Sequence, residues 1–342
     1  MIQIAKLFAS LRAGATSQRL LSVQGRSVAI YSHRSEVATA ACRSLSAWTL
    51  SELESATGTD DVCLVETYSK AGVQPNNWNI PPARQHHHPG MGTFLGYELA
   101  DGSAVVQAGR GALLCSAKGE LVWLVDDALL TGESDRWPNF TDLAIVFLAE
   151  ILRRGGFFLA HAGGIGREGR SLLLTGESGS GKSTLAVRKA MEGWDFYGDD
   201  MVIVGKDPEG IWRVYPFRRP IHLTANAAQL LGVPPGLTSE LTHSNKLQYD
   251  ISELCQARQS HSGTLAAVFC LRPDWTVKEP EPLSQLDALS VLGLNFLSGW
   301  NKGNVASELE NLLGLLVTTP VYQASWATDP SAFDNFLNPI SV

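Results

Sequence analysis

The chain has 342 residues, 44% of them hydrophobic and 18% charged, and a formal net charge of −7 at pH 7. This length suits two domains of ordinary size, and this composition is typical of globular proteins that bury a core. The acidic balance argues against a nucleic-acid partner, and five cysteines without a CxxC pair argue against a disulfide framework or a structural zinc site.

The N-terminal residues 1–21 contain no acidic residue and several basic ones. This bias is compatible with an organelle transit peptide, but we favour an amphipathic first helix with Ile4, Leu7, Phe8 and Leu11 on one side. No apolar run approaches the roughly 18 residues that span a bilayer, so we expect a cytoplasmic protein without a membrane partner.

Residues 1–138 predict a smaller, strand-rich α+β domain, which we expect to recognise a substrate or partner. Turn pairs such as Asp101-Gly102 separate its later strands, as in hairpins. A helix is expected over 35–48. The expected strands lie at 27–31, 62–66, 93–99, 103–108, 112–116 and 120–125.

Residues 69–91 are rich in proline and contain the run His86–His88, and we expect a long loop here. Three consecutive histidines cannot easily face one ion, and no carboxylate or cysteine cluster lies nearby in the sequence. The pattern therefore favours a loop without a metal and leaves its role open.

The second domain is expected over 139–342, where strands alternate with helices in the manner of an α/β sheet. A helix should begin near Thr141 and end at Gly155-Gly156, and a glycine-rich turn should follow the first strand. The expected strands lie at 157–161, 171–175, 196–204, 211–216, 265–271 and 320–326, and the later helices at 182–192, 283–297 and 304–316.

The stretch GESGSGKST lies between an expected strand and an expected helix, which is the context of a phosphate-binding loop. Its glycines let successive backbone N–H groups surround phosphate oxygens, and the helix N-terminus adds further donors. We expect Lys182 to reach the terminal phosphates of ATP and Ser183 to bind Mg²⁺. The candidate nucleotide-binding residues are Gly176, Glu177, Ser178, Gly179, Ser180, Gly181, Lys182, Ser183 and Thr184.

Two other users of this loop are disfavoured. An ABC ATPase needs an LSGGQ segment, and the chain offers only LSGW at 297–300. A GTPase needs an NKxD motif to read its base, but Asn245-Lys246 lacks the aspartate two residues after the lysine. Adenylate-type kinases and helicases also use this loop, so the loop alone does not name the reaction.

Two aspartates, Asp199 and Asp200, precede the apolar run MVIV. Adjacent carboxylates at a buried strand are costly unless their charge is used. One could accept a proton from an attacking hydroxyl while the other, for which we favour Asp200, holds metal. The alternative is a pair of strand-end carboxylates bound to backbone N–H groups or solvent. The more weakly indicated candidates are Arg218 and Arg219, which suit phosphate or carboxylate recognition.

Taken together, His161, the loop, Gly193 and the aspartate pair resemble the catalytic domain of the HPr kinase/phosphorylase family. That family has a histidine ahead of a GDSGxGKS loop and an Asp-Asp pair after the following helix. The resemblance implies the phosphoenolpyruvate-carboxykinase-like version of the P-loop fold, with catalytic roles at His161, Lys182, Asp199 and Asp200. It covers residues 157–204 most closely.

The chain departs from this family at two places. The segment PFRRPIHL at 216–223 stands where an IRG-type signature is expected, and a later Pro-Gly-Arg-Asn segment is missing. HPr is therefore a doubtful substrate, and phosphorolysis is left open. The layout resembles the divergent HPr-kinase-like proteins of peptide natural-product clusters, such as those of lasso peptides.

The sequence thus predicts an ATP- and Mg²⁺-dependent kinase acting on a hydroxyl, with a serine of a peptide or protein favoured. The alternatives are a kinase of a small-molecule alcohol and a non-catalytic, ATP-gated regulatory protein. The acceptor, the division of roles between Asp199 and Asp200, and the oligomeric state stay open, and a homo-oligomer is compatible with the sequence.

Overall fold

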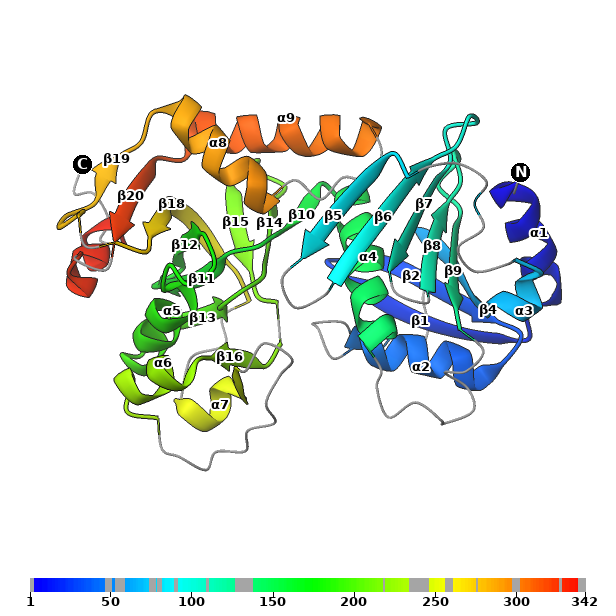
Figure 1. The fold of residues 1–342 in the computed structure, drawn as a ribbon, viewed down its shortest axis with the longest axis horizontal. Coiled ribbons are helices and arrows are strands. Elements are labelled where there is room, and N and C mark those ends of the chain that lie inside the picture. The colour runs from blue at the N-terminus through cyan, green and yellow to red at the C-terminus, as the bar shows by residue number, and fades with distance from the viewer. Residues whose placement is uncertain are drawn as a thin grey trace. The chain divides into compact units, whose positions relative to one another are not determined.

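The computed structural model divides into two compact units, which we describe separately (Figure 1). The first comprises residues 1–155 and 299–305, and the second comprises 156–298 and 306–342. The structure describes residues 3–46, 51–52, 59–73, 78, 82–88, 92–108, 111–126, 138–217, 219–233, 246–255, 261–274, 276–296, 302–325 and 328–337. Within these ranges, no helix combines the length and the apolar character needed to cross a membrane.

The first unit is built on a mixed sheet, in which the described residues form nine strands in the order β3-β1-β2-β4-β9-β8-β7-β6-β5. β2, β4 and β9 are parallel neighbours at its centre, and the remaining pairs are antiparallel. The strands are β1 (Ser17–Val23), β2 (Arg26–Ser32), β3 (Ser51–Glu52), β4 (Asp61–Thr67), β5 (Arg84–His88), β6 (Gly92–Glu98), β7 (Ala104–Ala108), β8 (Gly111–Cys115) and β9 (Leu121–Val125).

Helices cover both faces of this sheet, which explains why β9 is buried along its whole length. Trp123 stacks on Phe147 of one helix, whereas Val122 belongs to a cluster with Ile4 and Leu11 on the opposite face. The amphipathic N-terminal helix is thereby confirmed. The helices are α1 (Ile4–Gly14), α2 (Ser35–Ser46), α3 (Tyr68–Ala71) and α4 (Pro138–Arg154).

The helix α4 belongs to the first unit, where it packs against α2, β7 and β8. Its Arg154 also pairs with Asp61 of β4, at 2.8 Å between Nη1 and Oδ1. The break between the units therefore follows α4, at Gly155/Gly156, whereas the sequence places its boundary before this helix.

The second unit contains a mixed sheet with the order β10-β14-β15-β18-β12-β11-β13, in which β20 also pairs with β18 and β19 with β20. β12, β18 and β20 run parallel. The strands are β10 (Phe157–Ala160), β11 (Gly163–Arg167), β12 (Arg170–Gly176), β13 (Asp195–Gly198), β14 (Val202–Lys206), β15 (Trp212–Tyr215), β18 (Gly263–Arg272), β19 (Glu281–Pro282) and β20 (Val321–Ser325), and a separate pair is β16 (Ile221–Leu223) and β17 (Leu247–Tyr249).

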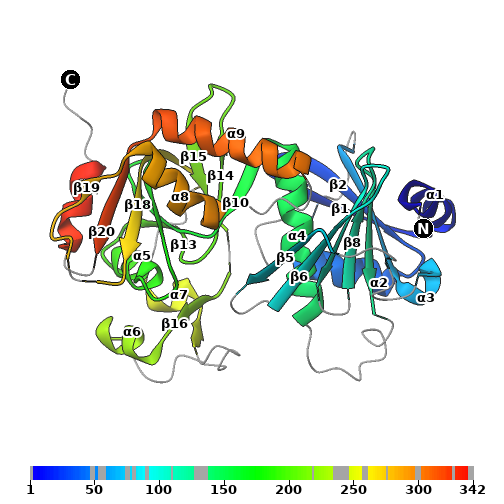
Figure 2. The same cartoon turned by 45° about the horizontal axis from the view of Figure 1, so that its top comes forward.

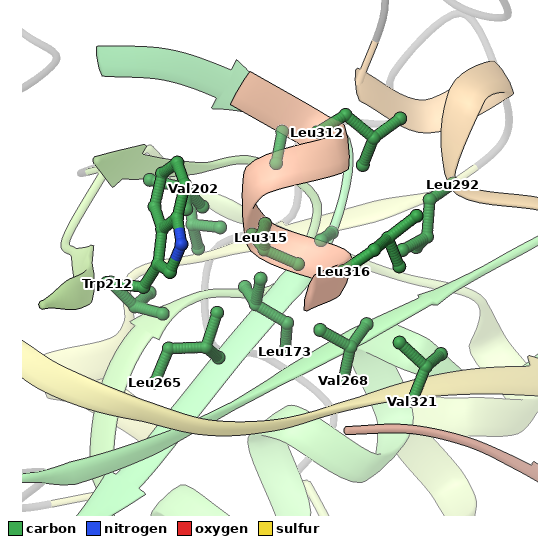
Figure 3. Packing of buried hydrophobic residues seen from close by; sticks show 14 of the residues in the cluster. Leu173, Val202, Trp212, Leu265, Val268, Leu292, Leu312, Leu315, Leu316 and Val321 are labelled. Carbon is green, nitrogen blue, oxygen red and sulfur yellow. The ribbon is translucent and has the colours of Figure 1, made fainter. Parts of the chain in front are cut away.

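Helices also lie on both faces of the second sheet (Figure 2). Leu173 and Val268 pack with leucines of α8 and α9 on one face (Figure 3). Leu172 and Leu174, of opposite parity on β12, pack with Ala186 of α5 on the other. The helical segments are α5 (Lys182–Met191), α6 (Ala225–Leu230), α7 (Ile251–Leu254), α8 (Gln285–Phe296), α9 (Lys302–Thr318) and the 3₁₀ segment η2 (Pro330–Phe336).

Three local expectations change in the structure. The histidine run forms β5, paired with β6, inside the expected loop. The glycine-rich turn after β10 contains β11, since a Cβ at Gly166 would lie 2.8 Å from the Tyr197 ring and only glycine fits. The expected strand 196–204 is two strands, β13 and β14, which pair with different neighbours.

Candidate nucleotide and phosphoryl-transfer site

The loop between β12 and α5 depends on three glycines. Gly176, Gly179 and Gly181 have φ values of +141°, +83° and +96°, a region that residues with a side chain rarely adopt. A Cβ at Gly176 would also lie 2.3 Å from the carbonyl oxygen of Leu271 on β18. The glycine spacing is therefore required by the conformation of the loop and by its approach to the neighbouring strand.

Lys182, the first residue of α5, returns its side chain to the start of the loop. Its Nζ donates to the carbonyl oxygens of Gly176 at 2.7 Å and Glu177 at 3.0 Å. Burial lowers the pKa of Lys182, Lys246 lowers it further, and Asp200 and Asp199 act in the opposite direction. The ammonium group is thus held at the loop, within electrostatic reach of both aspartates.

The break between β13 and β14 places the aspartate pair. Gly198 ends β13 at a point where a Cβ would lie 2.3 Å from the carbonyl oxygen of Met201. Because the backbone bends here, Asp199 and Asp200 do not alternate as in a regular strand. Asp199 is buried, with 2% of its surface exposed, whereas the side chain of Asp200 is 27% exposed.

Asp200 lies between two basic side chains. Its Oδ1 is 3.3 Å from His161 Nδ1, and its Oδ2 accepts a hydrogen bond from Arg219 Nη1 at 3.2 Å. Burial lowers the pKa of His161, which Asp200 partly offsets. Arg219 and His161 therefore fix the orientation of the more accessible carboxylate.

Asp199 lies in an environment that makes its carboxyl group less acidic than an ordinary aspartate. Burial raises its pKa to about 6, and the adjacent Asp200 contributes in the same direction. Arg219, the Ser183 hydroxyl and the His222 backbone amide act against this shift. Its Oδ2 has no hydrogen-bond partner among the residues that the structure describes.

The structure brings together His161, Lys182, Ser183, Asp199 and Asp200. The Ser183 hydroxyl donates to the backbone carbonyl of Asp199 at 3.4 Å, which joins the first turn of α5 to the aspartate pair. The oxygen atoms of this group are of the hard type that Mg²⁺ prefers, so the donor set fits the ion that the sequence predicts.

The other loop candidates are placed differently. Glu177, Ser178 and Gly179 are exposed, whereas the Ser180 hydroxyl is buried and has no partner among the described residues. Thr184 lies on the first turn of α5 and is half-buried. Residues 177–179 of the loop are thus accessible, whereas Ser180 and Lys182 are enclosed.

Sequence reasoning missed His222, whose backbone amide contacts Asp199 and whose own pKa is lowered by burial. Its only local signal was its position just after the arginine pair. Arg219, a weaker candidate in the sequence, contacts Asp200 directly, and Arg218 lies outside the described residues.

No family model matches the chain, and no curated protein is significantly similar to it. Among solved structures, the Hpr(Ser) kinase/phosphatase from Coxiella burnetii is similar over 49% of this chain and 85% of that chain, with 14% identity and a TM-score of 0.28. A likeness at this TM-score assigns neither fold nor function, so the geometry of the site has to carry the functional conclusion.

Proposed function

We propose that this protein is a kinase of the HPr-kinase-like type, which transfers the γ-phosphoryl group of ATP to a hydroxyl. The observation that carries the proposal is one arrangement. A glycine loop holding Lys182 lies beside the aspartate pair, with Ser183 joined to Asp199. A loop of this type binds phosphates, and a carboxyl group with a pKa near 6 can take up a proton at neutral pH.

The proposed reaction is an in-line displacement. The acceptor oxygen bonds to the γ-phosphorus, the bond from that phosphorus to the β–γ bridging oxygen breaks, and ADP leaves. The hydroxyl proton passes to a carboxylate, for which we favour Asp199 because burial raises its pKa to about 6. Lys182 and the loop amides neutralise the charge on the phosphates.

Ser183 and Asp200 would hold Mg²⁺, which would supply positive charge to neutralise the phosphates. Arg219 and His161 keep the Asp200 carboxylate in place for this purpose. Asp199 is then left for the acceptor proton, which separates the two aspartates by role.

For the acceptor we favour a serine of a peptide or protein, and HPr itself is disfavoured by the altered segment at 216–223. A small-molecule alcohol is the alternative acceptor. An ATP-gated protein without transferase activity has no need of a second carboxyl group with a raised pKa beside the phosphates, which favours the enzyme.

The test is transfer from radiolabelled ATP to peptide and small-molecule hydroxyl acceptors by the wild type and matched variants. We expect Asp199→Asn to lower kcat at least a hundredfold at saturating magnesium, since a general base contributes roughly that much or more. We expect Asp200→Asn to raise the magnesium concentration required. Asp207→Asn is the control, because Asp207 pairs with Arg213 at 2.6 Å much as Asp200 pairs with Arg219.

Full transfer activity in both Asp199→Asn and Asp200→Asn would refute the assignment of the base. If ATP binds but no acceptor is phosphorylated, the result supports the alternative of an ATP-gated protein without transferase activity.

A further inference from the structure

A cavity of about 580 Å³ opens beside the phosphate loop within the second unit. This volume lies in the range typical of pockets for small organic ligands. The cavity meets the end of the loop at Ser180 and Gly181 and continues past Thr184 along α5. Its other walls come from the end of α6, from Leu271 on β18 and from η2.

The cavity lies away from the reacting groups. Its lining includes Ser180, Gly181 and Thr184 but neither Lys182 nor Ser183 of the same loop, and neither aspartate. A chain of phosphates that begins in this cavity and ends at Lys182 would therefore present its last phosphate near Asp199 and Asp200.

The walls are mainly apolar. Leu185, Leu231, Leu271 and Phe333 line the cavity, and Leu230 stands at its edge with 70% of its surface exposed. Such walls suit the flat faces of a heteroaromatic ring. At the end next to the loop, the Ser180 hydroxyl is buried without a partner among the described residues, so a polar group on the ligand is needed there.

We propose that this cavity binds the nucleoside half of a nucleoside triphosphate, with the ribose near Ser180 and Thr184 and the base between α5 and η2. The inference rests on the proposed function, because it takes the phosphate loop as the site of the triphosphate. It adds the location of the nucleoside and the direction in which the nucleotide lies.

Three polar side chains of the cavity, Glu192, Ser325 and Thr328, are already engaged, which bears on the choice of base. Glu192 is bound by Arg188 at 3.2 Å and by Lys189 at 3.0 Å. The hydroxyl groups of Ser325 and Thr328 donate to the carbonyl oxygen of Val277. With no described lining carboxylate left to read guanine, the site should accept ATP and GTP with affinities within about tenfold.

The experiment is isothermal titration of the full chain with magnesium complexes of ATP, GTP and inorganic tripolyphosphate. We expect ATP and GTP to bind at least tenfold more tightly than tripolyphosphate. The double variant Leu230→Gln/Met191→Gln removes apolar contacts at the rim and should lose about tenfold for ATP but nothing for tripolyphosphate. Both side chains are exposed, so folding is not threatened. Leu286→Gln, a leucine with 76% exposure on α8, is the control.

Equal affinity for ATP and tripolyphosphate, or an unchanged ATP affinity in the rim variant, would overturn the nucleoside site and leave the phosphate loop intact. A difference between ATP and GTP well beyond tenfold would overturn the tolerance for the base. If neither ATP nor tripolyphosphate binds, the proposed function itself fails and this inference fails with it.

Discussion

At the scale of single residues, Asp199 shows how a buried carboxyl group lowers the stability of its own fold. A carboxyl group that is buried beside a second carboxyl favours the protonated form. The native state therefore binds this proton more tightly than the unfolded chain, in which an aspartate has a pKa of about 3.9. The contribution of Asp199 to the free energy of unfolding is fully present below the pKa of the unfolded chain. It is lost as the pH rises through the folded-state pKa of about 6.

We therefore predict that Asp199→Asn stabilises the magnesium-free protein at pH 8, by roughly 1 to 3 kcal/mol. The gain should shrink towards zero as the pH approaches 4, because the wild-type carboxyl is then protonated as well. Urea denaturation at several pH values, in EDTA and without nucleotide, measures the difference.

Asp207→Asn provides a contrast of opposite sign. The hydrogen bond from Arg213 lowers the pKa of Asp207, so its substitution should not stabilise the protein at pH 8. A variant of Asp199 that is less stable than the wild type at pH 8 and equally so at pH 5 would contradict the prediction.

The residues of the loop and the aspartate pair could be predicted from sequence because each signal is local. Lys182 and Ser183 follow a glycine pattern within nine residues, Gly176–Thr184. The contact of His222 with Asp199 could not be predicted from sequence, because a backbone amide makes it and it joins segments that are distant in the chain. Side-chain type carries no information about such a contact.

At the scale of elements, the regular strands and helices follow the hydrophobic pattern closely, and the exceptions have identifiable causes. The hydrophobic pattern does not predict β11, because Gly164 and Gly166 stand where a strand usually has apolar residues. Both glycines lie where Tyr197 packs closely. The sequence predicts a loop at β5 because proline-rich flanks surround this strand. The bend that divides β13 from β14 follows Gly198 and comprises Asp199 and Asp200, residue types that are depleted in strands.

The attachment of η2 to α5 gives a prediction at this scale. The buried Lys189 on α5 contacts Asp334 at 2.6 Å, Glu192 at 3.0 Å and the ring of Trp194 at 4.6 Å. Asp334→Asn leaves a buried ammonium group with fewer partners, so we expect a loss of about 1 to 2 kcal/mol in unfolding free energy. Urea denaturation followed by tryptophan fluorescence measures it.

Asp329→Asn is the matched control for that substitution. Asp329 caps the same 3₁₀ segment by accepting a hydrogen bond from the Ser331 backbone amide at 2.8 Å, and asparagine caps about as well as aspartate. Equal stability losses in the two variants would mean that the contact with Lys189 contributes nothing particular.

At the scale of the whole molecule, each unit has its own sheet with helices on both faces and its own buried cluster. An α/β arrangement with a strand-rich preceding part could be predicted from the alternation of elements. The assignment of α4 to the first unit could not be predicted, because an apolar helix face can pack on a sheet of either unit. The stacking of Trp123 on Phe147 shows that α4 packs on the first sheet.

This organisation predicts that a nucleotide stabilises the two units unequally. Magnesium-ATP at a hundred times its Kd should raise the stability of the second unit by about 2.7 kcal/mol. Scanning calorimetry should then show the transition of the second unit shifting to higher temperature, and hydrogen exchange should slow in the loop and α5 more than in β8 and β9. Equal protection of both units would contradict this expectation.

The approach of Gly176 to the carbonyl oxygen of Leu271 has a consequence for evolution. Leu271 also lines the cavity beside the loop, so one residue of β18 borders both the loop and the cavity. Selection from a library randomised over 176–179 should recover glycine alone at the first position and many residue types at the exposed position 178. Divergent descendants of this chain should then keep glycine at position 176 while the exposed part of the loop changes.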